Sequence, residues 1–125
     1  MGNLFLVMLG GAIGAGLRHL FGRAAFTVLG SGWPWGTLGV NLIGGFAMGL
    51  LTAVLARGSL GGENARLLLG VGVLGGFTTF SAFSLDAMLM IERGAFGSAL
   101  AYVAASVAGA ILALFAGLTL GRIAA

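Results

Sequence analysis

The chain has 125 residues, of which 59% are hydrophobic and 7% are charged, and it contains no cysteine. An average soluble domain has roughly 25% charged residues, so this composition excludes an ordinary soluble protein and indicates an integral membrane protein. Disulfides and thiolate chemistry are excluded, and a single histidine, His19, excludes a multi-histidine metal site within one chain. The six arginines are too few and too scattered for a nucleic-acid surface, so no nucleic-acid partner is expected.

Long stretches without charge predict four membrane-spanning helices in one domain, residues 1–125. Between Arg23 and Arg57 lie 33 uncharged residues, more than the roughly 20 that a helix needs to cross the hydrocarbon core. The first span is expected to be retained, because a cleavable signal would have a basic start and a shorter apolar segment. The predicted helices cover about residues 4–29, 36–56, 65–92 and 95–121.

Two connections between these helices carry clear signals. "GSGWPWG" at 30–36 predicts a turn because glycine and proline commonly interrupt helices, and Trp33 and Trp35 suit a membrane–water interface. "ARGSLGGENAR" at 56–66 is the polar connection between the second and third helices. The fold class predicted from these elements is an all-α membrane protein.

The arginines are divided equally between the two membrane faces. Orientation normally follows an excess of Lys and Arg in cytoplasmic loops, but three arginines on each face give no preference. The balance arises either by chance or from dual topology, in which copies insert both ways and pair as an antiparallel homodimer. The face that holds both termini carries Arg57, Arg66 and Arg122, and the opposite face carries Arg18, Arg23 and Arg93.

Glycine supplies the expected packing surface between helices. Several of the 25 glycines have the GxxxG spacing that lets helix backbones approach closely. Four short helices enclose little internal space, so a transport pathway is expected between protomers, and an oligomer is implied. The GxxxG pairs are Gly10/Gly14, Gly45/Gly49, Gly72/Gly76 and Gly117/Gly121.

"GGFTTFSAFSLD" at 75–86 places a glycine pair and hydroxyl residues near the middle of the third span. Membrane helices kink or break at such residues, so a break is predicted near residues 75–79. In an antiparallel dimer two such breaks would meet at the two-fold axis, where their carbonyl groups would suit a monovalent cation. The alternative is a straight helix whose hydroxyls bond back to the i−4 carbonyls.

Asn41 is a polar amide inside the otherwise apolar second span, and such side chains generally face the bundle or a watery pathway. Phe77, Phe80 and Phe83 recur every three residues along one side of a helix, a spacing that is also typical of core packing. An amide N–H and the positive edges of aromatic rings together form a neutral lining that favours a small anion.

Hydroxyl and basic residues extend this lining. Ser98, Tyr102 and Ser106 lie on one face of the fourth helix, where they either form a hydroxyl track or join helices together. Arg18 and His19 either raise the anion concentration at a pore mouth or anchor the first helix by snorkelling.

Three stretches closely resemble signature sequences of the Fluc, or CrcB-type, fluoride channel family. They are "GGAIGAGLRHL" at 10–20, "GTLGVNLIGGF" at 36–46 and the highly specific "GVLGGFTTFSAFSLD" at 72–86. The resemblance implies a protein of the bacterial inner membrane that forms a dual-topology antiparallel homodimer with a broken third helix. It also implies passive export of fluoride through two pores, with a structural sodium ion, Na⁺, at the dimer interface.

The resemblance also implies roles for individual residues. Asn41 would hydrogen-bond fluoride, and Phe80 and Phe83 would present ring edges to it. The backbone carbonyls of Gly75 and Thr78 would hold sodium. The other residues that the resemblance assigns to the pore and its vestibule are Tyr102, Ser106, Ser81 and Arg18.

Three positions depart from the family pattern. His19 stands where a tyrosine is more familiar, and Ala82 stands where threonine is frequent. Ala110 continues the line of hydroxyl residues on the fourth helix without a hydroxyl.

Two other functions compete with a channel. A small multidrug-type cation exporter needs a membrane-embedded carboxylate, but the first helix has none and Asp86 lies toward the end of the third. A non-transporting accessory subunit explains the glycines but not Asn41 beside a broken, phenylalanine-lined helix. An enzyme is not expected, because the sequence has no paired carboxylates, activated nucleophile or metal cluster.

Overall fold

The computed structural model describes residues 1–58 and 61–124, and all its regular elements are helices. Four helical spans in this part of the chain are long and apolar enough to cross a membrane, which confirms the prediction of an all-α, multi-pass membrane protein. Residues 59 and 60 of the predicted polar connection lie outside the described residues. The four spans are Gly2–Leu29, Trp35–Ala56, Gly62–Glu92 and Phe96–Ile123.

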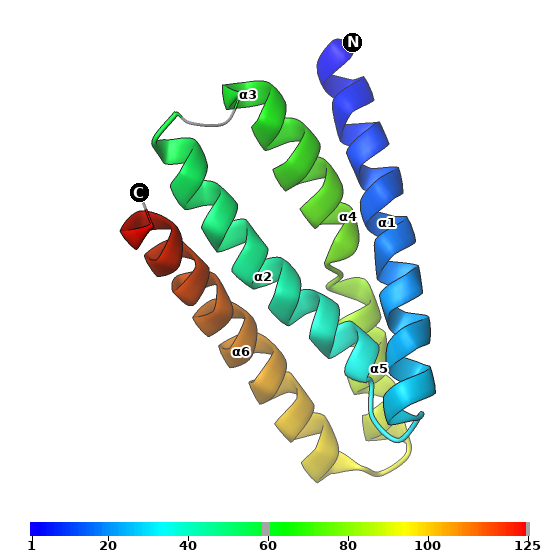
Figure 1. Ribbon diagram of the computed structural model, residues 1–125. Helices are drawn as coiled ribbons and strands as arrows, with labels where there is room; N and C mark the ends of the chain where they lie inside the picture. Colours follow the sequence, from blue (N-terminus) through cyan, green and yellow to red (C-terminus); the bar gives the residue numbers. More distant parts are fainter. Residues whose placement is uncertain (59–60, 125) are drawn as a thin grey trace.

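The spans form a bundle in which both chain termini lie at the same end (Figure 1). Helix α2 (Trp35–Ala56) packs along α6 (Phe96–Ile123), and α1 (Gly2–Leu29) packs against the first half of the third span. The third span consists of four consecutive pieces: α3 (Gly62–Ala65), η1 (Arg66–Leu74), α4 (Gly75–Phe77) and α5 (Ser81–Glu92).

The η1 segment is a π-helix, which the sequence did not predict. The hydrogen bond from the Gly75 N–H to the Gly70 carbonyl spans five residues instead of the four of an α-helix. π-Helical turns are rare in proteins, and those that occur are often found at functional sites. This wider helix leads directly into the glycine pair and the threonines of the third span.

Glycines bring the helix backbones of both pairs into close contact, as predicted. A Cβ atom at Gly10 would lie 2.8 Å from the Cα atom of Gly72, and one at Gly49 would lie 2.8 Å from the Leu118 nitrogen. Both distances are far below a van der Waals contact. A larger residue at Gly10 would therefore separate α1 from η1, and a larger residue at Gly49 would separate α2 from α6.

The turn between α1 and α2 places Trp33 against α6. Gly30 ends α1 with a φ of 81°, a conformation that favours glycine, and its N–H donates to the Phe26 carbonyl at 2.9 Å. Pro34 follows and caps the first turn of α2 by accepting from the Leu38 N–H at 3.1 Å. The indole N–H of Trp33 then donates to the Ser98 hydroxyl at 3.0 Å.

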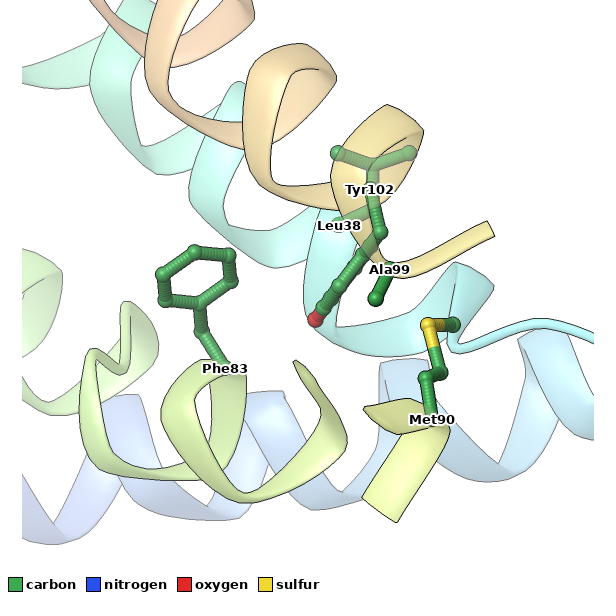
Figure 2. Close-up of a cluster of buried hydrophobic side chains, with 5 residues drawn as sticks. All are labelled: Leu38, Phe83, Met90, Ala99 and Tyr102. Atoms are coloured by element: carbon green, nitrogen blue, oxygen red, sulfur yellow. The ribbon is translucent and has the colours of Figure 1, made fainter. Parts of the chain in front are cut away.

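A cluster of buried side chains joins α2, α5 and α6 in the half of the bundle away from the termini (Figures 1 and 2). Many large apolar side chains are exposed on the outer surface, among them Phe5, Ile111 and Phe115, which suits contact with lipid or with another copy of the chain. The buried cluster consists of Leu38, Phe83, Met90, Ala99 and Tyr102.

Candidate functional site

The third span leaves the helical conformation between α4 and α5. α4 ends at Phe77, Thr78 is extended with φ −84° and ψ 159°, and α5 begins at Ser81. Gly75, by contrast, has the helical angles φ −62° and ψ −39°. The non-helical residues therefore lie at 78–80, immediately after the glycine pair rather than on it.

Asn41 of α2 forms two hydrogen bonds with the backbone of one non-helical residue, Thr79. The Asn41 Nδ2 donates to the Thr79 carbonyl at 2.9 Å, and the Thr79 N–H donates to the Asn41 Oδ1 at 2.8 Å. An Asn amide has two N–H groups, so the second N–H of Asn41 is left for another acceptor. The sequence predicted a polar group facing the interior but did not predict its pairing with Thr79.

Two carbonyl groups next to the interruption lose their helical hydrogen-bond donors. In a continuous α-helix the Gly75 carbonyl would accept from the Thr79 N–H, but that N–H bonds to Asn41. The Thr78 carbonyl would accept from the Ala82 N–H, which instead donates to the Thr79 Oγ1 at 3.1 Å. These are the two carbonyls to which the family resemblance assigned sodium.

Arg18 of α1 contacts the last turn before the interruption. Its Nε donates to the Gly76 carbonyl at 3.1 Å, and the contact is partly buried. Thr78 turns its own hydroxyl back to the Leu74 carbonyl at 3.0 Å, the i−4 bond that was the alternative to a break. This bond closes the end of α4, and the chain then departs from the helix.

A groove of about 380 Å³ opens beside the interruption, between α2, α5 and α6. It brings together Asn41, Phe80, Phe83 and Ser106, four of the residues that the sequence predicted to contact an anion. Apolar groups dominate the lining, and its described residues include no Lys, Arg, Asp or Glu. The other lining residues are Gly44, Gly45, Met48, Thr78, Thr79, Val107, Ala110, Ile111 and Leu114.

The two phenylalanines of the groove differ in their surroundings. Phe83 is 8% exposed and belongs to the buried cluster, whereas Phe80 is 77% exposed and stands at the open side of the groove. Their ring centroids lie 5.5 Å apart with an interplanar angle of 47°. One ring is therefore fixed by the protein interior, and the other ends at an uncovered surface.

Ser106 is buried in the groove with an unpaired hydroxyl. Its side chain is 6% exposed, and its Oγ has no hydrogen-bond partner among the described residues. A buried hydroxyl without a partner costs about 1–3 kcal/mol. The groove therefore contains a polar atom that a bound ligand can satisfy.

Tyr102 lies behind Phe83 rather than on the lining of the groove. It is 0% exposed, and its ring centroid is 5.3 Å from that of Phe83 (Figure 2). Its hydroxyl donates to the Asp86 Oδ2 at 3.0 Å. The sequence did not place Asp86 in the site. A carboxylate inside a membrane span requires a polar partner, so its position in the third span is the feature of the sequence that could have identified Asp86.

Three other residues noted in the sequence lie away from the groove. Ser81 is exposed at the start of α5, and Ser98 accepts the hydrogen bond from Trp33. His19 is exposed and lines a surface pocket of about 460 Å³ on α1, together with Arg18 and Arg23. The basic residues of α1 are thus gathered on one surface, apart from the groove.

A metal centre built from side chains is not formed in the described part of the chain, where no three residues of the types His, Cys, Asp and Glu gather. The oxygen atoms that the interruption leaves without helical donors are the backbone carbonyls of Gly75 and Thr78. Backbone carbonyls released from interrupted helices are ligands that suit a hard monovalent cation. Two carbonyls are too few to enclose such an ion, so one chain supplies at most part of a site.

The fold and the site together are those of a small multi-pass membrane protein with a neutral groove beside an interruption in its third span. The sequence profile of the CrcB-like protein family, Camphor Resistance (CrcB), matches residues 5–118. The chain therefore belongs to the CrcB-like family, which confirms the resemblance found in the sequence.

Individual relatives agree with this assignment. A protein of Chelativorans sp. (strain BNC1) named "Fluoride-specific ion channel FluC" is 63% identical over 122 residues, which cover 98% of each chain. Proteins with the same name from Phenylobacterium zucineum (strain HLK1) and Sphingopyxis alaskensis are 60% and 57% identical, and each match covers 98% of this chain and 97% of the relative. These relatives are named as ion channels and not as enzymes, in agreement with the prediction of a non-enzymatic protein.

Proposed function

We propose that the chain is a fluoride-selective ion channel that passively exports fluoride from the bacterial cytoplasm across the inner membrane. The observation that carries this proposal is the groove in which Asn41, Phe80, Phe83 and Ser106 meet. Its chemistry fits a small dehydrated anion. The names of the close relatives give independent support.

Asn41 and Ser106 supply hydrogen-bond donors to the ion. The bonds to Thr79 fix the orientation of the Asn41 amide before the ion arrives, so its second N–H is already positioned. The Ser106 hydroxyl, unpaired among the described residues, gains a partner when an anion enters. Hydrogen bonds to charged groups are worth about 1.5–3 kcal/mol, which offsets part of the dehydration of the ion.

The phenylalanine rings complete a lining that carries no full charge. The edge of an aromatic ring has a partial positive charge, so Phe80 and Phe83 attract an anion weakly when their edges face it. Conduction requires that an ion bind well enough to enter and weakly enough to leave. A lysine or arginine in the groove would hold fluoride too tightly, and none is among the described lining residues.

A second copy of the chain completes the pathway. Phe80 is 77% exposed, so the groove of a single chain is open toward its surroundings. An antiparallel homodimer covers this side, and its two-fold symmetry produces two equivalent pores from one kind of interface. The equal numbers of arginines on the two faces support the insertion of copies in both orientations.

A sodium ion at the two-fold axis joins the two copies. The Thr79 N–H bonds to Asn41, and the Ala82 N–H bonds to the Thr79 hydroxyl. The Gly75 and Thr78 carbonyls therefore lack their helical donors and are available to a cation. Two chains supply four such carbonyls around one point. The role of the ion is structural: it neutralises carbonyl dipoles that would otherwise be buried without partners.

The two competing functions have less support. A cation exporter needs a carboxylate that alternates between proton and substrate, but Asp86 accepts a hydrogen bond from the buried Tyr102. An accessory subunit would use the glycine contacts without needing a groove that holds Asn41 and a Ser106 hydroxyl with no partner among the described residues.

Fluoride efflux from liposomes tests the proposed function. The purified chain is reconstituted into vesicles loaded with potassium fluoride, and efflux is followed with a fluoride electrode after valinomycin is added. We expect rapid, passive fluoride release and much slower release of chloride from matched vesicles. Vesicles that retain fluoride would contradict the proposal, and proton-driven export of an organic cation would favour the exporter.

A further inference from the structure

A continuous series of aromatic contacts connects the turn between α1 and α2 to the groove. The ring centroids of Trp33 and Tyr102 are 5.5 Å apart, those of Tyr102 and Phe83 are 5.3 Å apart, and those of Phe83 and Phe80 are 5.5 Å apart. Distances of this size are those of interacting aromatic pairs. Trp33, which precedes the second span, is thus linked through two buried rings to the groove.

Trp33 is held at the start of this series more firmly than an interfacial anchor requires. Its indole N–H donates to the Ser98 hydroxyl at 3.0 Å, and its ring meets Tyr102 edge to face at an interplanar angle of 76°. It also packs against the buried cluster of α2, α5 and α6. Trp35, two residues later, is 39% exposed and fits the role of a surface anchor better.

We propose that Trp33 is a positioning residue for ion conduction: it fixes Tyr102, which in turn fixes the Phe83 ring at the groove. Tyr102 is held from one side by Trp33 and through its hydroxyl by Asp86, so Phe83 packs against a ring that is held at two points. This inference rests on the proposed fluoride function. If Trp33 is removed, Tyr102 can move into the space that the indole leaves, and Phe83 can follow it away from the ion.

Four variants of the full-length protein separate the ring contact from the hydrogen bond. Trp33→Leu removes both, Trp33→Phe keeps a ring, and Ser98→Ala removes only the acceptor. Phe96→Leu is the matched control, because Phe96 is a 66% exposed aromatic residue at the same end of α6. We expect fluoride efflux to fall about tenfold or more in Trp33→Leu, because small displacements of positioning contacts have effects of this order. Trp33→Phe should recover part of the loss, and Phe96→Leu should match the wild type.

Tryptophan fluorescence supplies a readout that does not depend on transport. In a Trp35→Phe background Trp33 is the remaining tryptophan. We expect Phe83→Ile to change the emission of Trp33, since both residues contact Tyr102. Emission that is unaffected by Phe83→Ile would overturn the proposal, as would wild-type efflux from a folded Trp33→Leu protein.

Two further outcomes are also decisive. If Trp33→Leu does not fold, Ser98→Ala takes its place, and unchanged efflux together with unchanged Trp33 emission in that variant would overturn the proposal. If the wild-type protein releases no fluoride, the proposed function fails, while the coupling between Phe83 and the Trp33 emission is still measured separately.

Discussion

Asn41 and Thr79 are joined by a reciprocal pair of hydrogen bonds across 38 residues of sequence, at 2.9 Å and 2.8 Å. The pair satisfies both backbone polar groups of a residue that has left the helix inside a membrane span. An unsatisfied group at that depth costs several kcal/mol. One side chain therefore stabilises the interruption of the third span and places an N–H at the groove.

Asn41→Asp is expected to impair both functions of this residue. The carboxylate has no N–H for the Thr79 carbonyl, and its charge repels an anion in the groove. We expect fluoride efflux to fall about 100-fold, the scale seen when one preorganised donor is lost. The free energy of unfolding should fall by about 1–3 kcal/mol, measured by chemical denaturation in detergent.

Thr79→Ser is the control for the Asn41 prediction. It keeps the backbone groups that bond to Asn41 and the hydroxyl that accepts from the Ala82 N–H. Efflux and stability should stay near the wild-type values. A folded Asn41→Asp dimer that carries fluoride at the wild-type rate would show that the site assignment is wrong.

Ser106→Ala should reduce fluoride conduction without reducing the stability of the protein. Removing a buried hydroxyl that is unpaired among the described residues should leave stability unchanged or raise it by about 1 kcal/mol. Fluoride efflux should nevertheless fall about tenfold, because the ion loses a charged-group hydrogen bond. Thr52→Val is the matched control, since the Thr52 hydroxyl is exposed and bonds back to the Met48 carbonyl. Equal efflux from Ser106→Ala and wild-type protein would remove Ser106 from the pathway.

Gly75→Ala tests the sodium site. The nearest atom to a Cβ at Gly75 is the Gly70 carbonyl oxygen at 3.6 Å, so the single chain accommodates the methyl group. In the proposed dimer that methyl would lie beside the carbonyls proposed to hold sodium. We expect the wild-type melting temperature to be higher in sodium than in N-methylglucamine, and the variant to lose this difference.

Gly76→Ala provides the contrast to Gly75→Ala. A Cβ at Gly76 would lie 2.7 Å from the Gly11 carbonyl oxygen, so the contact between α1 and α4 is disturbed within one chain. This variant should melt at a lower temperature in both salts. A wild-type melting temperature that does not depend on sodium would contradict the proposed ion.

Hydropathy predicted the spans because the thickness of the membrane sets a length that any helix must satisfy. The 33 uncharged residues between Arg23 and Arg57 leave little choice of fold for that region. The position of the interruption was harder to predict. The glycine pair suggested it, but Gly76 serves the close contact with Gly11 on α1, and the helix ends at the threonines instead.

The polar partners within the bundle depend on tertiary structure and could not be derived from spacing. Tyr102 and Asp86 are on different helices, and their hydrogen bond exists because the turn at 93–95 folds α6 back along α5. Periodicity placed Tyr102 and Ser106 on one face of α6, yet only Ser106 lines the groove, since Phe83 lies in front of Tyr102.

Orientation in the membrane should respond to added charge. Because the arginines are balanced three against three, two lysines added to the connection at 57–66 should direct most copies into one orientation. Fluoride efflux should fall, and co-expression with a variant biased in the opposite sense should restore it. Labelling of tagged termini from each side of the membrane measures the bias. Wild-type termini found on one face alone would contradict dual topology.

The last prediction concerns the two phenylalanine rings. Phe80→Ile and Phe83→Ile keep a large apolar side chain but remove the positive ring edge, so both should strongly reduce fluoride efflux. Their effects on stability should differ because the exposed fractions are 77% for Phe80 and 8% for Phe83. We expect a cost within about 0.5 kcal/mol for the exposed residue and up to about 1.5 kcal/mol for the buried one.

Stability and efflux measured on the same folded samples distinguish ion contact from packing. If the rings act through packing alone, within one chain or across the proposed dimer, a folded and dimeric Phe80→Ile protein should transport normally, because isoleucine keeps a large apolar side chain. If the ring edges contact the ion, Phe80→Ile should be stable and inactive. A stable Phe80→Ile protein with wild-type efflux would therefore refute the ring-edge role, while leaving the hydrogen bonds of Asn41 and Ser106 as the remaining contacts for the anion.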